Sequence, residues 1–89
     1  MLIGIPKEIK GGEFRVGMTP ASVREALGHG HSVVVEHDAG IGIGASDQDY
    51  ETLGATIAPD AATVWANADL VVKVKEPQAH ERAKLRPDQ

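Results

Sequence analysis

The sequence has no cysteine, few aromatic residues and no long apolar run. Without cysteine, a disulfide framework and a thiolate metal site are excluded. No apolar stretch approaches the ~20 residues that a membrane-spanning helix requires. Because aromatic residues make up only 3 % of the chain, the core must be built from Val, Ile, Leu and Ala. That composition suits a parallel sheet covered by Ala-rich helices.

Positive charge is also scarce. Nine Lys and Arg stand against 13 Asp and Glu, which gives a formal net charge of −4. This balance provides no electrostatic footprint for nucleic acid. The N-terminal stretch MLIGIPKEIK lacks the long apolar segment of a signal peptide. We therefore expect a cytoplasmic protein with neither nucleic acid nor a membrane as its partner.

Apolar runs alternate with helical patterns along the whole chain. Short apolar runs predict four strands, at residues 2–5, 32–36, 55–58 and 69–75. Helical patterns follow the N-cap candidates Thr19, Ser46 and Asp60, and a fourth occupies residues 78–86 with Leu85 as its one large apolar anchor. The order β-α-β-α-β-α-β-α predicts an α/β fold, a flavodoxin- or Rossmann-like parallel sheet with helices on both faces. Four short strands leave such a sheet incomplete, so we expect the chain to be part of a longer protein.

Two cations are expected to meet at one edge of this sheet. Right-handed crossovers bring the carboxyl ends of all strands to the same edge, where α/β proteins bind ligands. Lys75 ends the last predicted strand, and Arg15 lies in the loop that leaves the first. Since alternate strand residues face the same way, Lys73 should lie deeper and could pair with a carboxylate. Lys75 should lie at the rim, free to meet a small anion or a carbonyl.

Each of these cations also has a plainer interpretation. Arg15 could form an exposed ion pair with Glu13, although an arginine fork also suits a carboxylate, which it grips with two bonds. Lys73 and Lys75 could simply extend their ammonium groups into water. The spacing of the residues alone does not decide between these interpretations.

Two other patterns favour no site. Gly40, Gly42 and Gly44 form G-x-G-x-G, whereas dinucleotide binding requires G-x-G-x-x-G directly after a strand. We therefore interpret residues 38–45 as a flexible loop. The four histidines lack the ligand partners of a zinc site, so they are interpreted as surface residues and no metal site is predicted: His29, His31, His37 and His80.

Four motifs together resemble a known family: GIPKE, EFRV-x-x-TP, GHxVxVE and ADLVxKVKEP. Along essentially its whole length the chain is similar to the N-terminal part of alanine dehydrogenase. The wider family includes the alpha subunit of proton-translocating nicotinamide nucleotide transhydrogenase. Because transhydrogenase subunits typically read KVNAP where this chain reads KVKEP, Lys75 favours the dehydrogenase. Gly17 departs from the family, which usually has Ala or another small apolar residue there, and this is expected to loosen the end of the loop.

The resemblance implies a two-domain enzyme that converts L-alanine, NAD and water to pyruvate, ammonia and NADH. Residues 1–89 would form the N-terminal portion of its substrate domain, and NAD would bind a domain outside this chain. Arg15 matches the family's carboxylate-binding arginine, and Lys75 matches the lysine that contacts the substrate carboxylate and keto oxygen. The family's acid/base histidine and catalytic aspartate lie beyond residue 89. This segment is therefore expected to carry no catalytic residue and to be inactive alone.

The resemblance also implies an assembly, since the family forms hexamers, and a homo-oligomer is expected here. Two alternatives stay open. The chain could be the N-terminal segment of a transhydrogenase alpha subunit, or a non-catalytic fragment that stands alone as an interaction module.

Overall fold

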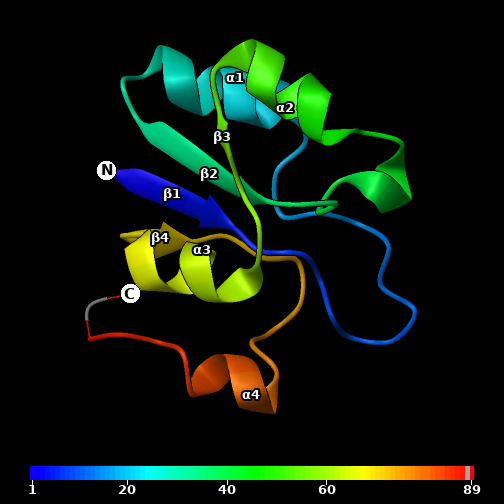
Figure 1. The fold of residues 1–89 in the computed structure, drawn as a ribbon, viewed down its shortest axis with the longest axis vertical. Coiled ribbons are helices and arrows are strands. Elements are labelled where there is room, and N and C mark those ends of the chain that lie inside the picture. Colours follow the sequence, from blue (N-terminus) through cyan, green and yellow to red (C-terminus); the bar gives the residue numbers. More distant parts are fainter. Residues whose placement is uncertain (88) are drawn as a thin grey trace.

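Four parallel strands form one sheet in the order β3-β2-β1-β4 in the computed structural model, which describes residues 1–87 and 89 (Figure 1). The strands are β1 (Leu2–Ile5), β2 (Ser32–Glu36), β3 (Thr56–Ala58) and β4 (Leu70–Val71). The helices are α1 (Pro20–Gly28), α2 (Asp47–Leu53), α3 (Ala61–Asn67), α4 (Ala79–Arg82) and the 3-10 helix η1 (Ile41–Ile43). The predicted α/β class and the alternation of strands with helices are confirmed.

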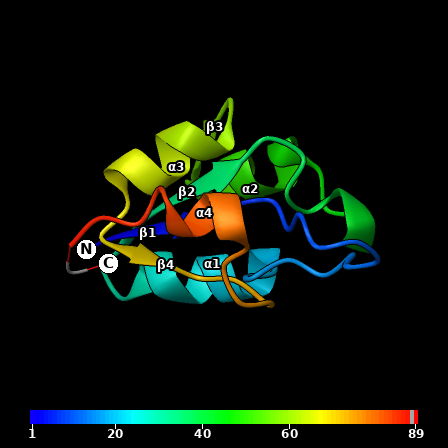
Figure 2. The same cartoon turned by 90° about the horizontal axis from the view of Figure 1, so that it is seen from below.

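The strand order reverses direction at β1. The chain adds β2 and then β3 on one side of β1, and afterwards crosses back to place β4 on the other side. Helices α1 and α2 cover one face of the sheet, and α3 covers the opposite face (Figure 1). In the view from below, α4 lies in front of the sheet (Figure 2). The loops that follow β1 and β4 thus flank the point of reversal, which is where doubly wound sheets bind ligands.

Alternating side chains of the two central strands supply the core. Ile3 and Ile5 of β1 pack with Val33 and Val35 of β2 beneath α1 and α2, where Tyr50 completes the cluster. The opposite face holds a second, smaller cluster of buried residues: Val34, Ala58 and Val64. Apolar burial of this kind contributes roughly 25 cal/mol per Å2 to folding.

The predicted N-caps are present. The side chain of Thr19 accepts a hydrogen bond from the Ser22 N–H, and Ser46 forms a capping box with Asp49. Asp60 accepts from both the hydroxyl and the backbone N–H of Thr63, and these two bonds lower the pKa of its carboxyl. Each cap of this type stabilises a helix by about 0.5–2 kcal/mol.

The glycine at position 4 sets the distance between β1 and α3. A Cβ built there would lie 2.5 Å from the Cβ of Ala68 and 2.9 Å from Cγ1 of Val64. Both contacts are closer than carbon atoms can approach. The absence of a side chain at Gly4 therefore lets α3 pack directly on the central strand.

Two predicted segments differ from the structure. The strand predicted over 69–75 is only two residues long, because beyond Val72 the backbone N–H groups bond a side chain instead of the neighbouring strand. The flexible loop predicted over 38–45 contains η1, and Ala39 and Ala45 within it are buried. That segment is ordered by close packing: a Cβ at Gly42 would lie 2.2 Å from the carbonyl oxygen of Phe14.

The predicted anchor of the last helix is also wrong. Leu85 lies beyond the end of α4 and is 41 % exposed. The buried residue of α4 is instead Glu81, which is 1 % exposed. Among the described residues no helix is both long enough and apolar enough to cross a membrane.

Candidate functional site

The loops after β1 and β4 are joined by the carboxylate of Glu8. Its Oε1 accepts hydrogen bonds from Lys73 Nζ at 3.2 Å and from the Lys75 N–H at 3.3 Å. Its Oε2 accepts from the Val74 N–H at 3.1 Å. All three donors lie some 65 positions further along the chain. Glu8 belongs to the GIPKE motif, but the sequence did not indicate that its side chain would be buried.

A buried cation lies between Glu8 and a second carboxylate. Lys73 Nζ is 3.3 Å from Oε2 of Glu81, and the side chains of Lys73, Glu8 and Glu81 are all nearly inaccessible to solvent. The prediction that Lys73 lies deep and pairs with a carboxylate is confirmed. Glu81 also accepts the Gln78 N–H at 2.9 Å in the capping box of α4. A helix of four residues has little stability of its own, so this ion pair holds α4 in place.

Arg15 lies on the surface near this network. Its Nε is 3.0 Å from Oε1 of Glu13, so the ion pair that the sequence suggested is formed, but the Glu13 side chain is only 7 % exposed. The Arg15 side chain is 66 % exposed, which leaves its terminal nitrogens accessible to a ligand. Arg15 also lines a hollow of about 270 Å3, together with Glu8, Phe14 and Asp38.

Lys75 lines a different hollow, of about 380 Å3, which it shares with Val71, Lys73 and Trp65. Val71, Lys73 and Lys75 were predicted to face the same way, and all three line this hollow. The structure therefore brings the loops of Arg15 and Lys75 to one edge of the sheet, while their side chains line separate hollows. Glu8 connects the two, because it lines the first and bonds the backbone of Lys75.

The glycine at position 17 fits the two loops together. A Cβ built there would lie 2.3 Å from the carbonyl oxygen of Val72, so any side chain would push the Arg15 loop away from the end of β4. The expectation that Gly17 loosens this loop is wrong. The glycine permits the close approach of two backbone segments.

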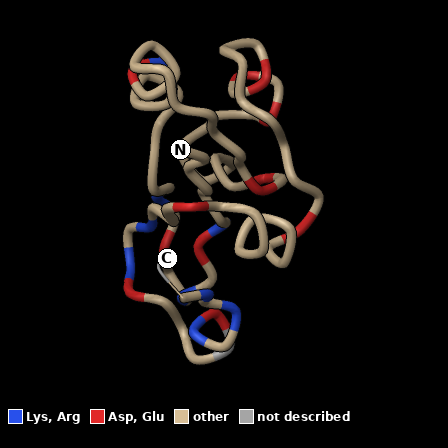
Figure 3. The backbone as a smooth tube through the Cα atoms, turned by 90° about the vertical axis from the view of Figure 1, so that its left-hand side faces the viewer, with Lys and Arg blue, Asp and Glu red and all other residues tan. Residues whose placement is uncertain are grey.

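Charged residues are distributed unevenly over the molecule. In Figure 3 most of the Lys and Arg lie in the lower half, the half that contains α4, and Asp and Glu are interspersed with them. Lys10 and Glu76 form one such pair at 3.1 Å, and both side chains are exposed. The pKa of Glu76 is lowered by a hydrogen bond from its own backbone N–H and by Lys10.

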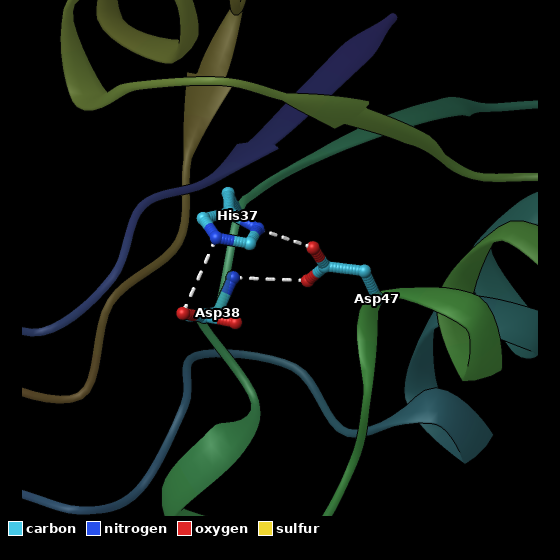
Figure 4. Close-up of side chains that lie close together, drawn as sticks. All are labelled: His37, Asp38 and Asp47. Carbon is cyan, nitrogen blue, oxygen red and sulfur yellow. Dashed lines mark hydrogen bonds and ion pairs between the residues drawn. The ribbon is translucent and has the colours of Figure 1, made fainter.

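A second cluster, formed by His37, Asp38 and Asp47, lies at the carboxyl end of β2 (Figure 4). The imidazole Nδ1 of His37 is 2.5 Å from Oδ2 of Asp47, and Nε2 is 3.3 Å from Oδ2 of Asp38. Oδ1 of Asp47 accepts the Asp38 N–H at 2.9 Å. Since the two ring nitrogens face different carboxylates, the geometry favours the protonated imidazole, in which both nitrogens donate. One metal ion could use only one of the two nitrogens.

Hydrogen bonds and charge shift the pKa values of this cluster. The hydrogen bond to Asp47 raises the pKa of His37, and the negative charges of Asp38 and Asp47 raise it further. Burial pushes the pKa of Asp47 upward, but the bonds from the Asp38 N–H and the His37 ring outweigh it, and the pKa is lowered. Both shifts favour the charged pair.

The histidines only partly follow the prediction that they are surface residues. His29 and His37 are exposed, as predicted, and His29 lies 3.5 Å from Glu25. His31 is half-buried, and its Nδ1 is buried without a hydrogen-bond partner in the part of the chain that is described. The side chain of His80 lies outside the described residues.

The fold is of the doubly wound α/β class, a class whose members bind ligands at the loops along this edge of the sheet. Residues 4–89 match the family model described as "Alanine dehydrogenase/PNT, N-terminal domain", and the chain belongs to this family.

Relatives of known name agree with this assignment. The chain is 52 % identical over 85 residues to the alanine dehydrogenase of Halomonas elongata, and 46 % identical over 89 residues to that of Mycolicibacterium smegmatis. It covers 96 % and 100 % of its own length in these matches, but only 23 % and 24 % of the relatives. The chain thus spans about a quarter of the length of the proteins it matches.

Solved structures show the same fold. An L-alanine dehydrogenase superposes with a TM-score of 0.95 at 50 % identity, over 100 % of this chain and 24 % of that one. The transhydrogenase from Sinorhizobium meliloti superposes with a TM-score of 0.91 at 36 % identity, over 99 % of this chain and 26 % of that one. Both groups of enzymes named in the family description are therefore represented among the structural relatives.

Proposed function

We propose that this chain is the N-terminal segment of an NAD-dependent L-alanine dehydrogenase and contributes the groups that hold the substrate. The proposal rests on one observation above all: the loops carrying Arg15 and Lys75 meet where the strand order reverses, and Glu8 joins them. The named relatives and the KVKEP motif support it.

The two cations suit the chemistry of a small keto acid. The exposed guanidinium of Arg15 can grip the carboxylate of L-alanine or pyruvate with two bonds. The ammonium of Lys75 can approach the keto oxygen beside that carboxylate, where negative charge builds up as ammonia adds to the carbonyl. A fixed cation next to developing charge lowers the barrier of the chemical step. This role requires both cations to reach one ligand, although they line separate hollows.

The residues of this chain do not fit NAD. The glycines at positions 40, 42 and 44 lack the dinucleotide spacing, and they build the 3-10 helix η1 and its ends. NAD, which accepts the hydride from alanine in the proposed reaction, would be held by another domain of the full-length protein. A hexamer located in the cytoplasm is part of the same proposal.

The main test replaces Lys75 by Ala in the full-length protein. The loss of transition-state stabilisation should be ~2–4 kcal/mol, expressed mainly in kcat. Lys10→Ala is the control, because it removes another lysine, an exposed one, from the same half of the molecule. Near-normal turnover of Lys75→Ala would remove Lys75 from the mechanism.

A second test uses residues 1–89 alone. This segment should not oxidise NADH in the presence of pyruvate and ammonium, because it lacks both an acid/base group and a dinucleotide site. Clear activity of the isolated segment would contradict the proposal.

The transhydrogenase alternative is supported by the similarity to the Sinorhizobium meliloti structure. It predicts hydride transfer between two nicotinamide nucleotides and no reaction with alanine. Lys75 argues against it, because transhydrogenase subunits typically read KVNAP where this chain reads KVKEP. Assaying the full-length protein with and without L-alanine separates the two functions.

A further inference from the structure

The Glu8 carboxylate fixes the backbone that carries Lys75. Two consecutive N–H groups, those of Val74 and Lys75, donate to its two oxygens at 3.1 and 3.3 Å. Within the described part of the chain these N–H groups have no backbone partner. The segment has already left β4 at this point, so the sheet no longer holds it. The direction in which the Lys75 side chain leaves the backbone therefore depends on Glu8.

A comparison of Glu8 with the neighbouring carboxylate of Glu81 separates an effect on the position of Lys75 from an effect on the stability of the protein. Glu8 and Glu81 both bond Lys73 Nζ, at 3.2 and 3.3 Å, and both side chains are 2 % exposed. The second oxygen of Glu81 accepts a hydrogen bond from the Gln78 N–H and so caps α4. Only Glu8 contacts the backbone of Val74 and Lys75. The two carboxylates thus share one buried cation and differ in what else they hold.

We propose that Glu8 is a positioning residue that orients Lys75 toward the substrate. This inference rests on the function proposed above. Glu8 need not touch the substrate, because it acts through two backbone hydrogen bonds. A displacement of a catalytic group by ~1 Å can cost about 100-fold in rate, so a shift of this segment by less than one bond length is sufficient.

The charge balance of the network indicates that Glu8 can be changed without unfolding the protein. Glu8, Lys73 and Glu81 together carry a net charge of −1 in a nearly solvent-free position. Glu8→Gln leaves the neutral pair of Lys73 and Glu81. The new amide has one oxygen and one NH2 group, and its NH2 cannot accept from a backbone N–H. At least one of the bonds to Val74 and Lys75 is then lost.

The experiment measures kcat and KM of the full-length protein in four variants: Glu8→Gln, Glu81→Gln, Lys75→Ala and the double variant Glu8→Gln/Lys75→Ala. We expect Glu8→Gln to lower kcat on the order of 10- to 100-fold. Glu81→Gln should lower the melting temperature about as much as Glu8→Gln does, while its kcat stays within about twofold of that of the unsubstituted protein. Because Glu8 acts through Lys75, adding Glu8→Gln to Lys75→Ala should cause no further loss, which is the behaviour of a coupled pair in a double-mutant cycle.

Three results would overturn the inference. Losses of kcat that multiply in the double variant would show that Glu8 acts independently of Lys75. Equal losses in Glu81→Gln and Glu8→Gln would show that only the shared network matters. Normal kcat in Glu8→Gln would show that Lys75 needs no positioning. Full kcat in Lys75→Ala, by contrast, would overturn the proposed function itself.

A conservative variant keeps the test decisive if Glu8→Gln does not fold. Glu8→Asp retains the negative charge beside Lys73 but is shorter by one methylene, so it cannot reach all three donors. It should fold and still lose kcat, by a smaller factor than Glu8→Gln would. A folded Glu8→Asp with unchanged kcat would likewise overturn the inference.

Discussion

In two regions of this molecule a basic side chain lies between two carboxylates, and the two regions differ in burial. Lys73 lies between Glu8 and Glu81, with side-chain exposures of 6 %, 2 % and 2 %. His37 lies between Asp38 and Asp47, with side-chain exposures of 59 %, 41 % and 23 %. The sequence separations differ too: the buried network joins loops some 65 positions apart, whereas the exposed cluster spans 11 residues.

The difference shows what burial does to an ion pair. Water can solvate an exposed charge that loses its partner, so most exposed pairs contribute at most about 1 kcal/mol. A buried charge without a partner has no such replacement, and breaking a buried pair costs about 3–5 kcal/mol. We infer that the Lys73 network determines how the two edge loops are arranged, while the His37 cluster responds mainly to pH.

The largest expected effect follows from removing the buried cation. Lys73→Met leaves Glu8 and Glu81 buried and facing each other, and should lower the free energy of unfolding by about 3–5 kcal/mol. Urea denaturation measures it. Lys10→Met, which removes an exposed lysine, should change it by no more than about 0.5 kcal/mol. A loss below about 1 kcal/mol in Lys73→Met would mean that burial does not distinguish the two regions.

A smaller loss of stability is expected when position 73 keeps its positive charge but the group that carries the charge has another shape. Lys73→Arg places a planar guanidinium where a compact ammonium fits between two carboxylates. Overfilling a buried site usually costs about 1–3 kcal/mol, which denaturation of the same protein would show. Full stability of Lys73→Arg would indicate that the network tolerates movement, and would weaken the case for a fixed Lys75.

In the exposed cluster, Asp47→Asn removes the charge beside His37 but keeps an oxygen for the Asp38 N–H. The free energy of unfolding near neutral pH should fall by about 0.5–1.5 kcal/mol, the range of one hydrogen bond. The same denaturation experiment measures it. A loss as large as that of Lys73→Met would contradict the contrast between the two regions.

The smallest expected effect is the pH dependence of the stability that His37 and Asp47 contribute. The pKa of His37 is raised above its ordinary value of 6.5, so its stabilisation is complete below that value and is lost as pH rises through the folded-state pKa. The pKa of Asp47 is lowered below 3.8, so its contribution exists above that value and disappears as pH falls through the folded-state pKa. Lys7 opposes the shift of His37 slightly.

The melting temperature, measured from about pH 5.5 to about pH 8.5, tests this dependence. The difference between the native chain and His37→Asn should be largest at the acidic end and should shrink as pH rises. A difference that stays constant over this range would show that the imidazole does not titrate in contact with Asp47.

Local signals predicted most of the fold. Thr19, Ser46 and Asp60 were identified as caps because a cap bonds the backbone within three residues, and each helix starts where its cap indicates. The depth of Lys73 followed from strand alternation, another local rule. Predictions of this kind succeed when cause and effect lie close together in the chain.

The features that were missed depend on distant partners. The last strand is short because Glu8, far back in the chain, accepts the N–H groups that would otherwise continue the ladder. Nothing in the GIPKE motif indicates that the carboxylate turns inward. Nothing in the sequence around Asp47 indicates that its side chain binds His37. These roles become visible only when the sheet has brought the segments together.

The central place of β1 has a consequence for biosynthesis. This strand is the first to be made, yet one of its two neighbours, β4, comprises residues 70 and 71. At 5–20 residues per second, a ribosome needs roughly 4–14 s to reach that point. Until then one flank of the strand lacks its partner, and a nascent chain exposes it to other polypeptides. The edge between β1 and β4 accordingly forms only after the other three strands of this sheet have been made.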